Sequence, residues 1–177
     1  MKFTITAGHS NTDPGAVANG VKEADLAVWL RDTTVSKLRQ LGHSIVTDGA
    51  PGQNEPLSKA LTLITSADKA IEIHFNAATP TAKGVETIAL PKDKALAQKL
   101  SQAIAEVLMT KVRGDAGFID QSKSARGKLG FVSRGGLIIE VCFITNTTET
   151  AFYNDRKWLV ASAIAGTLDD WSKRRIL

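Results

Sequence analysis

The sequence predicts an α/β fold: a single domain with a twisted, mostly parallel central β-sheet and helices on both faces. Along the 177 residues, short apolar segments alternate with longer segments whose apolar residues recur at helical spacing. Turn-forming Gly, Pro, Asn and Asp residues separate these segments. No internal repeat or linker marks a second domain, and a chain of this length can bury one core. We therefore expect one domain over residues 1–177.

The segments of strand length are apolar or β-branched and end at turn residues or at a histidine. In chain order, we expect strands over Lys2–Ala7, His43–Thr47, Ala70–His74, Val85–Leu90 and Leu137–Phe143. The first strand ends at Gly8, where a loop to Gly20 begins. Asp48 and Gly49 break the second strand.

The helical segments have apolar residues on one side at spacings of three and four. In chain order, we expect helices over Val21–Leu41, Leu57–Ser66, Asp93–Val112 and Arg156–Lys173. Asn19-Gly20 is interpreted as the cap of the first helix, and Gly42 and Gly114 as the ends of the first and third. Residues 115–136 show no clear period and contain several basic residues, namely Lys123, Arg126, Lys128 and Arg134.

The composition excludes several classes of protein. The hydrophobic content of 43% and charged content of 23% are typical of a globular domain. No apolar run approaches the roughly 18 residues of a membrane span, and the first residues contain no signal peptide pattern. The single cysteine, Cys142, excludes an intramolecular disulfide and suits a reducing compartment. The net charge of +4 favours an anionic partner. The single tyrosine disfavours a base-stacking nucleic-acid binder.

Two histidines stand at the carboxyl ends of predicted strands. His9 follows the first strand, and His74 ends the third. Sites in open α/β sheets form at the carboxyl ends of strands, so we expect the two side chains at one edge. Glu23 stands in the first turn of the first helix. The helix dipole is a sufficient reason for it, but its side chain could also reach back toward His9.

Glu140 lies in a predicted strand whose other residues are apolar, and a buried glutamate needs a partner. Two histidines and one glutamate are an established ligand set for a catalytic zinc ion, with water in the fourth position. His9, Glu23 and His74 could supply that set. Zinc lowers the pKa of its bound water toward ~7, and Glu140 could take the proton and hand it to a leaving amine. Cys142 is better interpreted as a small buried apolar residue than as a nucleophile.

The candidate residues belong to motifs that follow one another in a defined order. The motifs are Gly8-His9 with Asp13-Pro14-Gly15-Ala16, Glu23 at the start of a helix, His74-Phe75-Asn76-Ala77, Gly84-Val85-Glu86, and Glu140-Val141-Cys142-Phe143-Ile144-Thr145-Asn146. With these motifs, the chain resembles the zinc-dependent N-acetylmuramoyl-L-alanine amidases of the Amidase_3 type over essentially its full length. The fold of that family, a twisted sheet flanked by helices, agrees with the fold expected from the residues.

The resemblance implies a reaction and a set of roles. His9, Glu23 and His74 would bind one zinc ion (Zn2+). Glu140 would be the catalytic carboxylate in hydrolysis of the amide between N-acetylmuramic acid and L-alanine of peptidoglycan. Family analogy also places Asn76 and Glu86 at the substrate. Arg134, in the basic segment, could engage stem-peptide carboxylates.

Two positions depart from the family pattern. Ser10-Asn11 stands where the family usually has glycines, which should affect loop flexibility more than chemistry. Glu72 stands where the family commonly has serine, two residues before the second histidine. Strand alternation puts Glu72 on the same face as His74. It could orient that histidine from behind, or compete with Glu23 for the metal.

Two rival functions stay open. A zinc peptidase or carboxypeptidase acting within the stem peptide uses the same metal chemistry and differs in its products. A non-catalytic wall-binding or nucleic-acid-binding module would need no zinc and would leave Glu140 unexplained.

The amidase interpretation also predicts the setting of the protein. Its partner would be peptidoglycan, with no nucleic acid and no membrane insertion, and it would act as a monomer. With no signal peptide and no separate wall-binding domain, we expect a bacteriolytic, phage-type endolysin. Such a protein is made in the host cytoplasm and acts on the cell wall after release. A bacterial amidase that lacks its export signal is the alternative.

Overall fold

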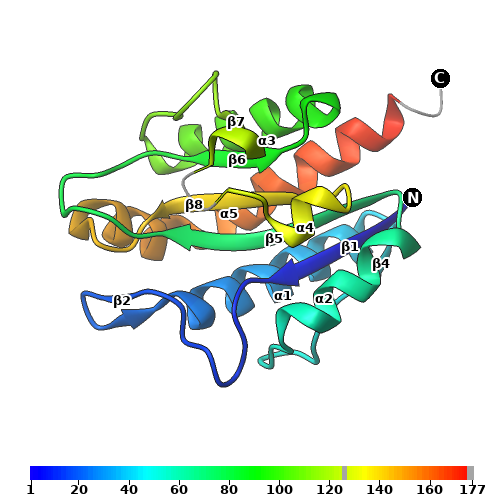
Figure 1. Cartoon of the computed structure of the whole chain (residues 1–177), viewed down its shortest axis with the longest axis horizontal. Coiled ribbons are helices and arrows are strands. Elements are labelled where there is room, and N and C mark those ends of the chain that lie inside the picture. Colours follow the sequence, from blue (N-terminus) through cyan, green and yellow to red (C-terminus); the bar gives the residue numbers. More distant parts are fainter. Residues whose placement is uncertain (125–126, 175–177) are drawn as a thin grey trace.

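The computed structural model describes residues 1–124 and 127–174, and its centre is a six-stranded sheet of order β4-β1-β5-β8-β6-β7 (Figure 1). The strands are β1 (Lys2–Ala7), β4 (Ser44–Val46), β5 (Lys69–Asn76), β6 (Glu86–Ala89), β7 (Phe118–Asp120) and β8 (Leu137–Phe143). The pairing is parallel except between β6 and β8, which run antiparallel. The prediction of a mostly parallel sheet in one α/β domain is therefore confirmed.

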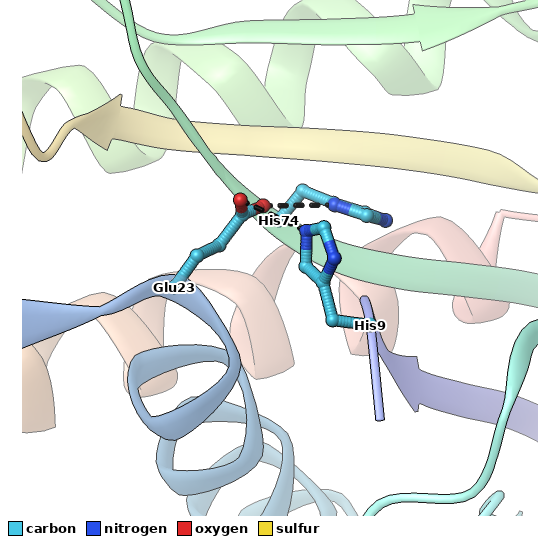
Figure 2. A group of neighbouring side chains, drawn as sticks. All are labelled: His9, Glu23 and His74. Atoms are coloured by element: carbon cyan, nitrogen blue, oxygen red, sulfur yellow. Dashed lines mark hydrogen bonds and ion pairs between the residues drawn. The ribbon is translucent and has the colours of Figure 1, made fainter. Parts of the chain in front are cut away.

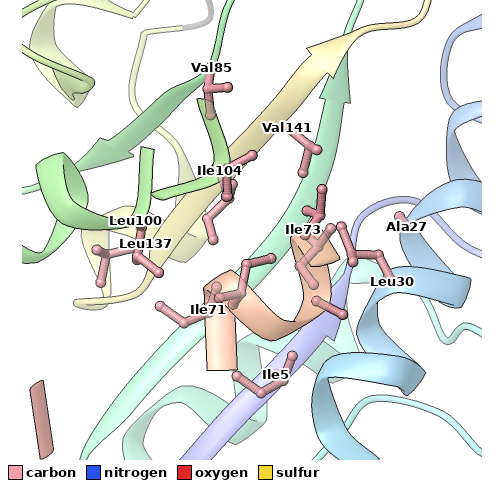
Figure 3. Packing of buried hydrophobic residues seen from close by; sticks show 14 of the residues in the cluster. Ile5, Ala27, Leu30, Ile71, Ile73, Val85, Leu100, Ile104, Leu137 and Val141 are labelled. Atoms are coloured by element: carbon pink, nitrogen blue, oxygen red, sulfur yellow. The ribbon is translucent and has the colours of Figure 1, made fainter. Parts of the chain in front are cut away.

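Helices cover both faces of the sheet, as predicted. The long helices α1 (Glu23–Gln40), α3 (Lys94–Leu108) and α5 (Thr147–Lys173) pack on one face, where their apolar residues form the main core with β1, β5 and β8. Figure 3 shows Leu30 of α1 and Leu100 of α3 in this core with Ile71 of β5. The short helices α2 (Leu57–Leu63) and α4 (Gly130–Ser133) lie on the other face, over a smaller apolar cluster.

The central strand β5 is buried on both faces, and its alternation decides which side chains meet. Ile71 and Ile73 point into the main core. Ala70 belongs to the smaller cluster under α2 and α4, so Glu72 and His74 share that side of the sheet. The polar residues of β5 therefore face the thinner layer, which leaves room for a cavity above them.

Two details of the fold differ from the sequence prediction. Asn19-Gly20 does not cap a helix; it is the turn of a hairpin between β2 (Val17–Ala18) and β3 (Val21–Lys22). Both turn residues have positive φ, 51° and 76°, as a two-residue hairpin turn of type I′ requires. Helix α5 begins well before the expected Arg156, because the side chain of Asn146 caps it by accepting from the N–H groups of Thr148 and Glu149.

The segment 115–136 contains regular structure that no periodicity indicated. It holds the edge strand β7, the one-turn helix α4 and a short 3₁₀ turn over Gln121–Lys123. Arg126, one of the basic residues noted in this segment, lies outside the described residues. Within the parts that the structure describes, none of the helices is both long enough and apolar enough to cross a membrane.

Candidate metal centre

His9 is the first functional side chain beyond β1, and buried polar groups fix the backbone that presents it. The N–H of Ala7 donates to Asp48 Oδ2 at 3.2 Å. The side-chain amide of Asn54 donates to the carbonyls of Ala7 and Gly8, at 3.2 and 2.7 Å. His9 itself has a φ of +69°, a left-handed conformation that is unfavourable for a residue with a side chain. The contacts on either side of the strand end impose this turn.

Two glycines allow the imidazole rings to approach the backbone. A Cβ atom at Gly8 would overlap the ring of His74, and one at Gly15 would overlap the ring of His9. Gly15 also has a positive φ of 64°. With both glycines in place, the two imidazoles lie edge to face with their centroids 5.1 Å apart.

The carboxylate of Glu23 contacts both histidines (Figure 2). Its carboxylate extends from the first residue of α1 and is 1% exposed. One oxygen lies 2.9 Å from His9 Nε2, and the other lies 2.9 Å from His74 Nδ1. The carboxylate also accepts from the N–H groups of Ala16 and Phe75, at 3.1 and 3.0 Å. The side chain therefore does reach back toward His9, which goes beyond a favourable interaction with the helix dipole.

The charges of this cluster depend on one another. Burial opposes ionisation of Glu23, but hydrogen bonds from His74 and His9 hold its pKa well below the usual range. Burial alone would lower the pKa of His74, but hydrogen bonds to Glu23 and Glu72, with the charges of Glu72 and Glu140, raise it to about 10. The pKa of His9 is also raised, because its hydrogen bonds to Glu23 and Asp13 outweigh its burial. The acidic surroundings thus favour positive charge at both imidazoles.

His9, Glu23 and His74 form a group that could hold a metal ion, since one donor atom from each lies within 4.8 Å of the others. Glu72 has a different position. Its Oε2 lies 3.2 Å from Nε2 of His74, whereas Glu23 approaches the Nδ1 of the same ring. Glu72 therefore contacts the second nitrogen of His74 and is not one of the three clustered donors.

Glu140 lies beside this group on the neighbouring strand. His74 of β5 and Glu140 of β8 are register partners, so both side chains project from the same face of the sheet. A cavity of about 370 Å³ opens there. Its polar lining is made of His9, Ser10, Asp13, Glu72, His74 and Glu140. The apolar part of its lining includes Leu57, Ile88, Leu129, Phe131 and Ile138.

The other residues suggested from sequence lie outside the lining of this cavity. Asn76 donates to Glu86 at 3.2 Å, and Glu86 also accepts from Arg113 at 2.6 Å. Arg134 is exposed at the end of α4. Sequence reasoning missed Arg113 and also the apolar wall around Phe131. The apolar run Leu129–Val132 inside the basic segment was the available signal for that wall.

Cys142 and His43 lie outside the metal centre, in surroundings that give each a structural role. Cys142 is buried, and burial raises the pKa of its thiol well above the ordinary value, which keeps the thiolate nucleophile from forming. His43 has its Nε2 3.2 Å from Asp169 of α5 and packs against Phe3.

Comparison with known proteins gives consistent matches over nearly the whole chain. Residues 4–170 match the family model described as N-acetylmuramoyl-L-alanine amidase. The chain is 40% identical to a Neisseria meningitidis protein assigned as an N-acetylmuramoyl-L-alanine amidase, with a TM-score of 0.87 over 94% of this chain and 93% of that one. It is 24% identical over 176 residues to the protein YqiI of Bacillus subtilis (strain 168), covering 94% of this chain and 82% of that protein.

A more distant structure shares the fold. The catalytic domain of CwlV, an N-acetylmuramoyl-L-alanine amidase from Bacillus (Paenibacillus) polymyxa var. colistinus, is 20% identical, with a TM-score of 0.81. The match covers 98% of this chain and 99% of that domain.

Proposed function

Because this chain belongs to the N-acetylmuramoyl-L-alanine amidase family, we propose that it uses one zinc ion to hydrolyse the amide between N-acetylmuramic acid and L-alanine in peptidoglycan. The enzyme class follows from the family, and the metal and the residue roles are the proposal. One observation supports them above all: the carboxylate of Glu23 contacts both His9 and His74, next to a cavity that also contains Glu140.

His9, Glu23 and His74 would hold the zinc ion. Two imidazole nitrogens and one carboxylate oxygen are a donor set that zinc accepts in catalytic sites, where a fourth position stays open. The three donor atoms are already close together, within 4.8 Å. The acidic neighbours that raise the pKa of both histidines equally favour a bound cation, which would take the place of the protons. The residues therefore fit the metal by chemistry and by charge.

The proposed reaction needs a group that moves a proton. When bound, the zinc ion supplies Lewis acidity that polarises the scissile carbonyl and makes water easier to deprotonate. A carboxylate oxygen of Glu140 accepts the proton of the attacking water and then donates it to the nitrogen of the leaving alanine. A C–O bond forms and the C–N bond breaks, which gives a lactyl carboxylate and a stem peptide with a free amino end. Phe131 and Ile138, in the apolar lining of the cavity, limit the access of bulk water.

Glu72 is proposed to orient His74. With its proton on Nε2, the His74 ring would donate a hydrogen bond to Glu72. The lone pair of Nδ1 would then point toward Glu23. This role is favoured over competition for the metal, because Glu72 lies at the ring nitrogen that does not contact Glu23.

The domain extent, the oligomeric state and the cellular setting of the protein are also proposals. We propose a single catalytic domain over residues 1–177 that acts as a monomer, and a phage-type endolysin made in the host cytoplasm and released to the wall. Its one cysteine, Cys142, suits synthesis in a reducing compartment. Asn76, Glu86 and Arg134 stay predicted substrate contacts.

The test of the proposed chemistry is the variant Glu140→Gln. The amide keeps the size of the side chain but cannot accept the proton, so we expect turnover of purified peptidoglycan to fall by roughly 10²–10⁴-fold. Zinc content and thermal unfolding should stay those of the wild type. Glu106→Gln, on the exposed side of α3, is the matched control and should keep full activity. A Glu140→Gln enzyme that cleaves at near the wild-type rate would exclude Glu140 from the mechanism.

A further inference from the structure

A second and larger hollow lies on the far side of the loop that follows His9. It has a volume of about 900 Å³ and runs along the outer side of α1. Its lining includes Ser10 of that loop, residues of α1 as far as Gln40 near the end of the helix, and Trp158 of α5. The part of α1 between Asp25 and Gln40 rises by about 22 Å. The hollow, here called the α1 groove, is thus long enough for an extended ligand.

The α1 groove borders the candidate metal centre. Ser10 lines both cavities, while His9 and Asp13 face the catalytic one and Asn11 lines the groove. The loop between them is held in place by two bonds to Asn54. The N–H of Asn11 donates to the carbonyl of Asn54 at 3.0 Å, and the N–H of Asn54 donates to Asn11 Oδ1 at 2.8 Å. A ligand in the groove would therefore lie next to a ligand at the metal centre, with Ser10 in the lining of both sites.

The lining of the α1 groove combines aromatic rings with uncharged polar groups. Trp158 is 60% exposed, which is unusual for so large an apolar surface, and it meets Trp29 edge to face at 4.8 Å. Hydroxyl and amide side chains, such as Ser36 and Gln40, line the groove along α1. An exposed indole face beside hydroxyls and amides suits a sugar, which presents C–H faces together with hydroxyl and acetamido groups.

The charges of the groove point to an uncharged ligand. Its acidic residues Asp25 and Asp32 are balanced by the basic residues Lys22 and Lys37. An anionic polymer or a stem peptide with free carboxylates would find no net positive charge among these four lining residues. The glycan strand of intact peptidoglycan is uncharged, because its lactyl carboxyl groups are tied up as amides.

We propose that the α1 groove binds the glycan strand of peptidoglycan while the stem-peptide amide lies at the metal centre. The inference rests on the proposed function in that it takes the wall polymer as the substrate. The groove would hold the strand by stacking against Trp158 and by hydrogen bonds from the polar side chains of α1. It would thereby favour polymeric substrate over a single muramoyl peptide.

The first measurement is direct binding of a neutral probe, a hexasaccharide of N-acetylglucosamine, to the full chain by titration calorimetry. Trp158→Ala should weaken this binding about tenfold or more, as truncation of an aromatic anchor residue does. Leu159→Ala is the matched control, since Leu159 is the adjacent residue of α5, is 57% exposed and does not line the groove. Its affinity should be unchanged. Ser36→Arg, at an exposed position of α1, should also weaken binding by filling the groove, and it serves if Trp158→Ala fails to fold.

The second measurement separates this inference from the proposed function. Trp158→Ala should slow cleavage of polymeric peptidoglycan but leave cleavage of a single N-acetylmuramoyl peptide unchanged. If the hexasaccharide binds in a Trp158-dependent way and no amide is cleaved, the proposed function fails and the groove assignment stands.

Three outcomes would overturn the groove assignment. The first is an active amidase that does not bind the hexasaccharide, or whose Trp158→Ala variant binds it normally. The second is binding of free stem peptide alone at the groove. The third is a mass by light scattering that drops from dimer to monomer in Trp158→Ala, which would make this face a contact between copies of the chain.

Discussion

The pair of Arg31 and Asp48 provides the sharpest test of how the fold holds the candidate metal centre. Arg31 projects from α1 and is fully buried. Its guanidinium donates to Asp48 Oδ1 at 3.0 Å and to the carbonyls of Ala50 and Gln53 at 3.1 and 2.7 Å. Asp48 in turn accepts from the N–H of Ala7, two residues before His9. Asp48→Ala would remove this link between α1 and the backbone before His9.

The expected loss of stability follows from the charge left behind. Burial raises the pKa of the Asp48 carboxyl in spite of the attraction of Arg31, so the cost of removing the pair from water is only partly repaid. Deleting Asp48 would leave the buried guanidinium with Asp32 alone as counter-charge, 2.8 Å from Arg31 Nη2, and loss of the charged hydrogen bond to Asp48 costs about 1.5–3 kcal/mol. The N–H of Ala7 would also lose its acceptor. Since a domain of this kind is stable by only about 5–15 kcal/mol, the change should be large.

The assay is urea unfolding followed by circular dichroism. We expect the free energy of unfolding of Asp48→Ala to fall by about 1.5–3 kcal/mol. The exposed control Glu106→Ala should change it by less than about 0.5 kcal/mol. The folded variant should also bind zinc more weakly, because the backbone that presents His9 loses an anchor. A loss below about 1 kcal/mol, together with unchanged zinc affinity, would refute this reasoning.

The remaining predictions concern the titration and reactivity of the buried groups. The pKa of His74 lies near 10 in the folded protein, against 6.5 for an unperturbed imidazole. Protonation of His74 therefore stabilises the metal-free fold fully below pH 6.5, and this stabilisation is lost as the pH rises toward 10. Because a metal must displace that proton, zinc affinity measured with a competing chelator should rise about tenfold per pH unit in this window, and a flat profile would contradict the assignment. Glu72→Ser should lower zinc affinity by about 10–100-fold if Glu72 orients His74, whereas a gain in affinity would indicate competition for the metal. Cys142 should resist alkylation by iodoacetamide at pH 8 until the protein is unfolded, and rapid labelling of the native protein would disprove its burial.

The sequence predicted the elements whose periodicity is strong and missed those that depend on single residues. The strand segments and the stripes of α1 and α3 are long enough for their apolar spacing to show. The helix that follows Asn19-Gly20 closely favours a cap there, although Asn-Gly is also a strong signal of a two-residue hairpin turn. The start of α5 was missed because its first turns are polar, yet Asn146 followed by Glu149 was a usable capping signal.

The candidate metal centre could be predicted because its residues lie where the topology brings strand ends together. His9 and His74 follow adjacent parallel strands, so their proximity follows from the fold. The supporting groups could not be predicted in the same way. Asp48, Asn54 and Arg113 act through contacts with residues far away in the sequence, and no local pattern marks such partners.

The central claim is that the cluster of His9, Glu23 and His74 uses zinc to cleave the muramoyl–alanine amide, and one measurement tests it most directly. Purified peptidoglycan is digested with the protein, with and without a zinc chelator, and the new chain ends are identified. We expect intact stem peptides with new amino-terminal alanine, no new reducing sugar ends, and loss of release with the chelator. Cleavage within the stem peptide, or release that the chelator leaves unchanged, would contradict the claim.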